Sequence, residues 1–309
     1  MGLINKDLLG MKQLTKEEIL EILDTAKTMK LVISSGNKKT SHLQGKSVVT
    51  LFYENSTRTR LSFELASKYM GSASANITTS GSSVNKGESL LDTARTIDMM
   101  GTDIIIMRHS QSGAPHFLAP YLNASIVNAG DGMNEHPTQA LLDMLTMYER
   151  FDTFEGKEVA ILGDIYHSRV VRSNIIGLSK LGAKVRVYGP KTMMPIGIEE
   201  MGAYVAKSVE DCCDGADAVM GLRVQLERMQ SSLFPSVAEY SKFYGITKEA
   251  LDLAKPDAFL MHPGPCNHGV EIPTEVYDCE KSVINEQVTN GVAVRMAVLY
   301  LLTARRNSL

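Results

Sequence analysis

The sequence lacks the features that mark several large classes of protein. Its 309 residues carry a formal net charge of −3, with no basic excess and no charged tail, which argues against nucleic acid as a partner. No apolar run approaches the roughly 20 residues that span a bilayer. The N-terminus also has no apolar stretch of signal-peptide length. We therefore expect neither nucleic acid nor a membrane as a partner.

Cysteine is scarce, and its spacing is uninformative about metals. The four cysteines are the adjacent pair Cys212 and Cys213, followed by Cys266 and Cys279. No CxxC spacing occurs, so a tetrahedral zinc site is not expected. Four cysteines in a chain of this length are not a disulfide framework. We interpret them as reduced thiols of a cytoplasmic protein and expect no metal.

What the sequence does contain is a regular alternation of short apolar runs with longer periodic ones. This alternation predicts βαβ units and an α/β fold of two doubly wound, parallel-sheet domains, since 309 residues exceed one typical core. The expected strands are 46–53, 72–78, 102–109, 124–130, 158–164, 184–190, 203–206, 217–223 and 258–264.

The expected helices have recognisable starts. One begins after Thr15, whose Thr-x-x-Glu pattern is a capping box, and another spans 136–151 with Pro137 at its first position. Further helices are expected at 57–70, 87–100, 113–122, 169–182, 246–254 and 291–305.

The polar stretch after the 136–151 helix predicts a domain boundary near 148–156. We expect domains at 1–150 and 151–290, with the last helix, 291–309, packing back on the first domain.

Ligands of open α/β sheets bind outside the carboxyl ends of the strands. The segment "STRT" (56–59) follows an expected strand there and begins a helix. First-turn N–H groups, hydroxyls and the Arg58 guanidinium could together cradle a phosphate. An ordinary Ser/Thr helix cap with solvated arginines is equally compatible. Arg60 points about 200° away around the helix and is expected to be structural.

Other strand ends add cationic and polar groups. Arg108 could pair with the same anion, and His136 lies at a helix start, where it could donate to a carbonyl oxygen. Arg169 and Arg223 follow strands of the second domain. The alternatives are a structural histidine and surface ion pairs. Together these residues predict phosphate-type groups on the first domain, carboxylate-type groups on the second, and an active site in the cleft between them.

Nucleotide motifs are absent from the two segments that partly resemble them. In "GSSVNKGES" (81–89) Lys86 precedes Gly87 instead of following it, and in "AILGDIYHSR" Gly163 is followed by no second glycine. We therefore expect no dinucleotide and no other cofactor.

The motifs "STRTR", "MRH", "HPTQALLD", "GLRVQ" and "HPGPCNHGVEI" together resemble the aspartate/ornithine carbamoyltransferase family over essentially the whole chain. "GLRVQ" and "KGES" resemble its aspartate-specific members, whereas ornithine-specific members carry "HCLP" and "SMG". The resemblance implies transfer of a carbamoyl group from carbamoyl phosphate to L-aspartate. The products would be N-carbamoyl-L-aspartate and phosphate, in de novo pyrimidine synthesis.

The resemblance also implies roles for individual residues. Catalysis would involve Arg58, Thr59, Arg108 and His136. Carbamoyl phosphate would contact Ser56, Thr57, Arg58, Thr59, Arg108, His136, Gln139, Gly264 and Pro265. Aspartate would contact Lys86, Arg169, Arg223 and Gln225, and Ser82 and Lys86 would come from a neighbouring subunit.

The implied assembly is a homotrimer with shared active sites, to which regulatory chains could bind. No side-chain general base is evident, so the leaving phosphate is the expected proton acceptor.

Three other functions are compatible with parts of this pattern. They are an ornithine or other amino-acid carbamoyltransferase, a two-lobed anion receptor that closes without chemistry, and a dinucleotide-dependent dehydrogenase. An assay of turnover with aspartate and with ornithine separates the first two from the family's aspartate-specific reaction. The missing glycines disfavour the third.

Overall fold

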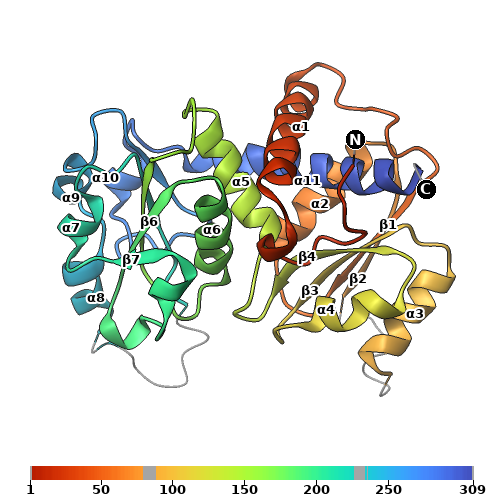
Figure 1. The fold of residues 1–309 in the computed structure, drawn as a ribbon, viewed down its shortest axis with the longest axis horizontal. Coiled ribbons are helices and arrows are strands. Elements are labelled where there is room, and N and C mark those ends of the chain that lie inside the picture. The colour runs from red at the N-terminus through yellow and green to blue at the C-terminus, as the bar shows by residue number, and fades with distance from the viewer. Residues whose placement is uncertain (1, 79–87, 226–233, 235, 308–309) are drawn as a thin grey trace. The chain divides into compact units, whose positions relative to one another are not determined.

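The structure is a computed structural model that describes residues 2–78, 88–225, 234 and 236–307 (Figure 1). Its contacts divide the chain into two compact units. Unit 1 comprises Met1–Leu145 and Thr289–Leu309, and unit 2 comprises Thr146–Val288. The sequence predicts these divisions at residues 150 and 290.

Unit 1 is built on a four-stranded, all-parallel sheet in the order β2-β1-β3-β4. Most positions of β1, β3 and β4 are buried, as expected for a parallel sheet covered on both faces. Each strand lies within one or two residues of its predicted range. The bounds are β1 Ser47–Phe52, β2 Ala73–Thr78, β3 Ile104–His109 and β4 Ser125–Asp131.

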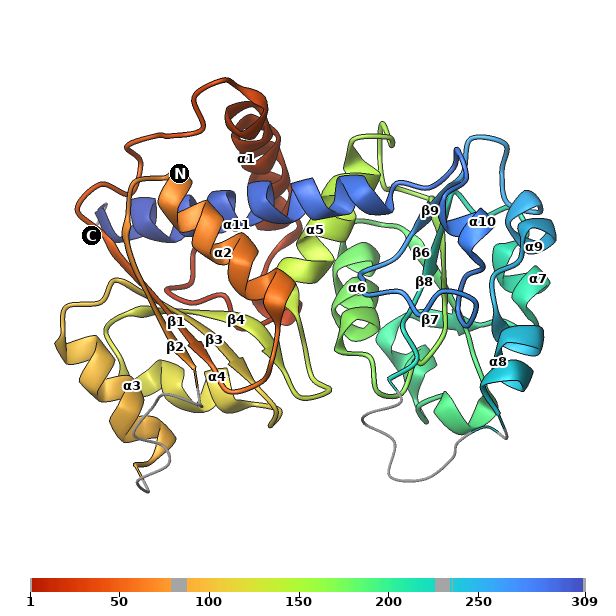
Figure 2. The same cartoon turned by 180° about the vertical axis from the view of Figure 1, so that it is seen from behind.

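Helices cover both faces of this sheet: α1, α2 and α11 lie on one side, and α3 and α4 on the other (Figures 1 and 2). The capping box of α1 is complete, since Thr15 Oγ1 accepts from Glu18 N and Glu18 Oε2 accepts from Thr15 N. The bounds are η1 Met11–Gln13, α1 Lys16–Ser34, α2 Thr57–Tyr69, α3 Leu90–Met99, α4 Ala114–Leu118, η4 Ala119–Tyr121, α5 Pro137–Tyr148 and α11 Ile284–Asn307.

The last helix, α11, begins at Ile284, earlier than the predicted residue 291. Its C-terminal part packs against the start of the chain, where Arg305 Nε donates to Ile4 O at 2.9 Å.

Unit 2 contains a five-stranded parallel sheet in the order β7-β6-β5-β8-β9. Helix α6 lies on one face, and α7 and α9 lie on the other (Figures 1 and 2). The strands are β5 Glu158–Leu162, β6 Lys184–Tyr188, β7 Ala203–Val205, β8 Ala218–Gly221 and β9 Phe259–Met261. The helices are α6 Arg169–Lys180, η5 Lys191–Met193, η6 Ile198–Met201, α7 Val209–Cys213, α8 Val237–Tyr244, α9 Lys248–Asp252 and α10 Thr274–Tyr277.

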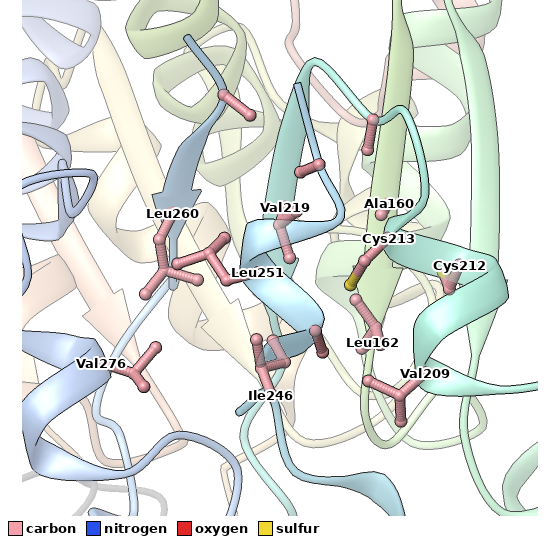
Figure 3. Packing of buried hydrophobic residues seen from close by; sticks show 14 of the residues in the cluster. Ala160, Leu162, Val209, Cys212, Cys213, Val219, Ile246, Leu251, Leu260 and Val276 are labelled. Carbon is pink, nitrogen blue, oxygen red and sulfur yellow. The ribbon is translucent and has the colours of Figure 1, made fainter. Parts of the chain in front are cut away.

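Two of the four cysteines belong to the hydrophobic core of unit 2. Cys212 and Cys213 are fully buried among apolar side chains of β5, β8 and α9, including Leu162, Val219 and Leu251 (Figure 3). Burial raises the pKa of both thiols, that of Cys213 to about 12. These two cysteines therefore act as small hydrophobic residues. All four cysteines lie in the described part of the chain and are free.

The strand orders determine which loops are neighbours. In unit 1, β1, β3 and β4 are consecutive in the sheet, and in unit 2, β5, β8 and β9 are consecutive. Because the strands are parallel, the loops at their carboxyl ends lie side by side at one edge of each sheet. Among the described residues, the helices are all too short or too polar to cross a membrane.

Candidate active site

The segment 56–59 forms the N-terminus of α2 directly after β1. Ser56 is the N-cap, and its Oγ accepts a hydrogen bond from Thr59 N at 3.3 Å. The helix-cap interpretation is therefore correct for Ser56, but a cap satisfies only one of the first-turn N–H groups. Thr59 is buried, whereas Thr57 and Arg58 are exposed. The arrangement leaves a helix N-terminus and an arginine beside the carboxyl end of β1, a suitable place for an anion.

Arg108 lies at the end of β3, opposite Phe52 of β1 in the parallel register. Its Nη2 donates to Glu54 Oε1 at 3.0 Å and its Nη1 donates to Ala129 O at 3.2 Å. Only 9% of Arg108 is exposed, so these two contacts fix the direction of a buried guanidinium. The structure thus places Arg108 beside the 56–59 segment. Glu54 was missed by the sequence analysis, although it stands just before "STRT".

The loop between β4 and α5 is organised by Asp131, whose side chain is fully buried. Its Oδ1 accepts from Asn128 Nδ2 and Glu135 N, and its Oδ2 accepts from Gly113 N and Asn134 Nδ2. Four donors on one carboxylate hold the loop that leads to His136. Buried at 4% exposure, His136 precedes the first residue of α5. Rigid support of this kind is what preorganised catalytic groups require.

Gln139 lies one turn into α5, and a buried charge pair supports it. Its Nε2 donates to Asp143 Oδ1 at 3.0 Å, and Asp143 is fully buried. Arg295 of α11 is also buried. Burial lowers its pKa to about 10, although the charge of Asp143 acts in the opposite direction. The guanidinium of Arg295 also lies 5.0 Å from the centre of the Phe63 ring in α2. Arg295 therefore links α11 to both helices that carry site residues, a role that no sequence motif indicated.

In unit 2, the end of β5 carries a carboxylate–imidazole pair next to Arg169. His167 Nδ1 lies 3.0 Å from both carboxylate oxygens of Asp164, which is fully buried. Ser168 caps α6, and Arg169 is the first residue of that helix, 4% exposed. The Asp164–His167 contact fixes the loop from which Arg169 extends.

The end of β8 carries Arg223 and Gln225, both half-buried. Gln225 N lies 3.5 Å from Asp164 Oδ2, so Asp164 links the β5 and β8 loops. The segments that follow β5 and β8 approach closely at Gly163, which has φ +138°. A Cβ at this position would lie 2.6 Å from Leu222 O. A side chain there would separate the two loops, and glycine is required for their proximity.

The loop after β9 contains Gly264 and Pro265, joined by a cis peptide bond. Gly264 N donates to His262 Nδ1 at 2.9 Å. Further along, Glu271 accepts from Val224 N at 2.6 Å and from Asn267 N at 2.8 Å. Val224 lies between Arg223 and Gln225, so Glu271 ties the β9 loop to the β8 loop.

The predicted site residues therefore form two groups within the described structure. Unit 1 brings together Ser56, Thr57, Arg58, Thr59, Arg108, His136 and Gln139 on the loops of β1, β3 and β4 and the helices that follow. Unit 2 brings together Arg169, Arg223, Gln225, Gly264 and Pro265 on the loops of β5, β8 and β9. Ser82 and Lys86 lie outside the described residues.

Two family models match these two parts of the chain. The carbamoyl-P binding domain of aspartate/ornithine carbamoyltransferase matches residues 6–149, and its Asp/Orn binding domain matches residues 155–302. The chain belongs to the aspartate/ornithine carbamoyltransferase family. The fold class and the family resemblance predicted from the sequence are thereby confirmed.

Two relatives with high sequence identity to the chain are aspartate carbamoyltransferases by name. The aspartate carbamoyltransferase catalytic subunit of Acetivibrio thermocellus is 63% identical, covering 99% of this chain and 98% of its own. The aspartate carbamoyltransferase catalytic subunit of Caldanaerobacter subterraneus subsp. tengcongensis is 58% identical, covering 99% of this chain and 100% of its own.

Among solved structures, aspartate transcarbamoylase from Trypanosoma cruzi in complex with N-(phosphonacetyl)-L-aspartic acid has a TM-score of 0.88 at 30% identity, covering 96% of each chain. Ornithine carbamoyltransferase from Thermus thermophilus has a TM-score of 0.85 at 26% identity, covering 97% of this chain and 99% of its own. The carbamoyltransferase fold is thus common to both substrate classes, while the higher sequence identities are with aspartate enzymes.

Proposed function

We propose that the protein is an aspartate carbamoyltransferase. It transfers the carbamoyl group of carbamoyl phosphate to the amine of L-aspartate, forming N-carbamoyl-L-aspartate and phosphate for pyrimidine synthesis. The observation that carries the proposal is the placement of arginines at strand ends of both units: Arg58 and Arg108 in one, Arg169 and Arg223 in the other. One pair suits a phosphate and the other a dicarboxylate.

In unit 1, the leaving phosphate is bound by the N-terminus of α2 with Arg58 and Arg108. The carbonyl oxygen becomes an oxyanion when the amine attacks, and Thr59, Arg108 and His136 are the donors available to it. Preorganised donors of this kind contribute roughly 3–4 kcal/mol each to transition-state stabilisation. Gln139, held by Asp143, and the backbone carbonyls of Gly264 and Pro265 orient the carbamoyl group.

The chemistry is a displacement at the carbamoyl carbon. The neutral α-amine of aspartate forms the new C–N bond, the bond from the carbamoyl carbon to the phosphate oxygen breaks, and the phosphate accepts the amine proton. The arginines neutralise two anionic substrates that otherwise repel each other. The reaction requires the residues of both units to act on the same pair of substrates.

Aspartate specificity follows from the charge of the unit 2 residues. Arg169, Arg223 and Gln225 present guanidinium and amide donors, which match the two carboxylates of aspartate. The side chain of ornithine ends in an ammonium group, which the same arginines would repel. The family members with the higher identities to this chain are aspartate carbamoyltransferases by name, which supports the same choice.

The proposal includes an assembly. A homotrimer with shared active sites, in which Ser82 and Lys86 reach the site of a neighbouring chain, would be the minimal active form. Regulatory chains could bind to it, and the free thiols agree with a cytoplasmic location.

Replacement of Arg223 by methionine tests the aspartate assignment. Loss of charge-assisted hydrogen bonds should raise the KM for aspartate by roughly 10- to 150-fold, with a much smaller change in the KM for carbamoyl phosphate. Steady-state kinetics with each substrate varied in turn provide the measurement. An equal rise in the KM for both substrates would refute the assignment. Turnover of ornithine by the wild-type protein would refute it as well.

A further inference from the structure

Three potential metal ligands converge in the loop after β9 of unit 2. His262, Cys266 and Glu271 each place one ligand atom within 4.8 Å of the other two. Within the described parts of the chain, this is the one such group of histidine, cysteine or carboxylate side chains. Thiolate, imidazole and carboxylate groups are each zinc ligands, and three protein ligands leave the fourth tetrahedral position open.

The separation of the sulfur and oxygen atoms already fits a metal. Cys266 Sγ lies 3.8 Å from Glu271 Oε2. A tetrahedral zinc ion with bonds of about 2.3 Å to sulfur and about 2.1 Å to oxygen would hold those two atoms about 3.6 Å apart. The observed distance needs almost no adjustment to accept an ion between them.

The carboxylate of Glu271 is oriented by groups that a metal would leave in place. Oε1 accepts from Val224 N and Asn267 Nδ2, and Oε2 accepts from Asn267 N. A carboxylate has about four lone-pair positions. The Cys266 thiol takes the remaining one. At Glu271 the metal would therefore replace the thiol proton and no other donor.

His262 is also held by a backbone donor. The residue is 1% exposed, and its Nδ1 accepts from Gly264 N, which holds the plane of the imidazole. A neutral imidazole has a single lone pair, so ligation of a metal by His262 would displace the hydrogen bond from Gly264 N. Glu271 is likewise buried, whereas Cys266 is half-buried and gives the group access to solvent.

We propose that His262, Cys266 and Glu271 bind a thiophilic divalent cation of the Zn²⁺ type, and that the bound cation inhibits turnover. On binding, the Cys266 thiol releases its proton to solvent and the thiolate coordinates the ion. One nitrogen of His262, whose lone pair is released from the Gly264 N hydrogen bond, and one oxygen of Glu271 complete three ligands, and water supplies the fourth.

The inhibition follows from what the ligands hold, and this part rests on the proposed function. Gly264 and Pro265 lie between two of the ligands, His262 and Cys266. The third, Glu271, accepts from Val224 N, in the segment that carries Arg223 and Gln225. A cation that joins the three ligands would fix both substrate-binding loops and prevent their adjustment during the catalytic cycle.

Cobalt spectroscopy on the full-length protein tests the site without reference to activity. Addition of Co²⁺ should produce a thiolate-to-cobalt absorption band that saturates at one equivalent per chain. The band should be lost in Cys266→Val and Cys266→Ser and retained in Cys279→Ser, a matched half-buried cysteine outside the cluster. Because Cys266 packs against the apolar core of unit 2, valine should be accommodated. No band in the wild type, or an undiminished band in both Cys266 variants, would overturn the site.

A Zn²⁺ titration of carbamoyl-aspartate formation tests the inhibition. The concentration for half-inhibition should rise at least 10-fold in Cys266→Val, each protein being compared with its own metal-free rate, while Cys279→Ser follows the wild type. Chelation should restore activity. A cobalt band accompanied by unchanged Zn²⁺ sensitivity in Cys266→Val would refute the inhibitory role. Absence of any metal-free turnover would instead refute the proposed function and leave the spectroscopic result valid.

Discussion

At the scale of single residues, two arginines that are close in sequence lie in different surroundings. Arg58 is exposed in the first turn of α2, whereas Arg60 is partly buried. The pKa of Glu64 lies below its ordinary value, mainly because Lys68 donates a hydrogen bond to it, and the charge of Arg60 adds to the effect. Arg60 thus belongs to a charge group on the surface of α2, and Arg58 is the candidate ligand.

Arg58→Ala should therefore lower kcat by roughly 100- to 1,000-fold, the loss found when one transition-state donor is removed. The folding transition should be unchanged, because the side chain is exposed. Arg60→Ala is the matched control and should retain most of the activity. Near-normal turnover in Arg58→Ala would exclude it as a phosphate ligand.

His109, beside Arg108, should make stability depend on pH. Burial lowers its pKa below the ordinary 6.5, and its Nδ1 accepts from Gln111 N. Below pH 6.5 the unfolded chain binds a proton that the folded chain resists, so this contribution to stability is present above pH 6.5 and is lost as the pH falls.

His109→Asn keeps an acceptor for Gln111 but removes the titrating group. The urea midpoint of the wild type should fall more between pH 7.5 and pH 5.5 than that of the variant. Parallel pH dependence of the two proteins would show that His109 does not contribute.

At this scale the sequence indicates candidate site residues better than it indicates the residues that support them. "STRT", Arg108 and His136 stand at strand ends, where the parallel-sheet rule locates ligands. Glu54, Asp131 and Asp143 are ordinary acidic residues in the sequence. Glu54 meets Arg108 only when distant segments come together. Asp131 and Asp143 accept from residues four positions away, but no sequence motif marks these contacts. The 262, 266 and 271 spacing likewise matches no short metal motif.

At the scale of elements, α11 is closely fitted to α5. Arg295 Nη1 donates to Gly291 O at 2.8 Å. A Cβ at Gly291 would lie 2.7 Å from Arg295 Nη1 and 3.3 Å from Leu142 Cδ2 of α5. The glycine makes room for the buried guanidinium that supports Asp143 and Gln139.

Gly291→Ala should therefore destabilise the protein, although alanine is ordinarily the better helix former by about 1 kcal/mol. Overpacking at a buried contact costs about 1–3 kcal/mol, which should lower the melting temperature measurably. Gly36→Ala is the control, because no atom lies within 4 Å of its added Cβ. A higher melting temperature for Gly291→Ala would contradict the described packing.

Most elements were predictable from their apolar runs. All nine predicted strands and the helices α1, α2, α3, α4, α5, α6 and α9 appear near their predicted ranges. The helices α7, α8 and α10 were missed, and their five, eight and four residues are too few to establish a helical period by themselves. The start of α11 was predicted too late, because "VINEQVTN" has no pronounced apolar face before the run at residue 291.

At the scale of the whole molecule, the proposal requires more than one chain. A trimer whose sites use Lys86 of a neighbour predicts complementation between two defective proteins. Each mixed trimer of Arg58→Ala and Lys86→Ala chains should contain one site with both residues intact. Mixing after dissociation should therefore restore activity to roughly a third of the wild-type level in the mixed trimers. No recovery, with mixed trimers verified by mass, would contradict shared sites.

The central claim is that this chain carbamoylates aspartate. The most direct measurement is carbon NMR of a reaction that contains ¹³C-labelled carbamoyl phosphate and equal concentrations of aspartate and ornithine. We predict that the labelled carbon appears in N-carbamoyl-L-aspartate, with one phosphate released per product and no signal from citrulline. Label in citrulline, or consumption of carbamoyl phosphate at no more than its spontaneous rate, would contradict the account.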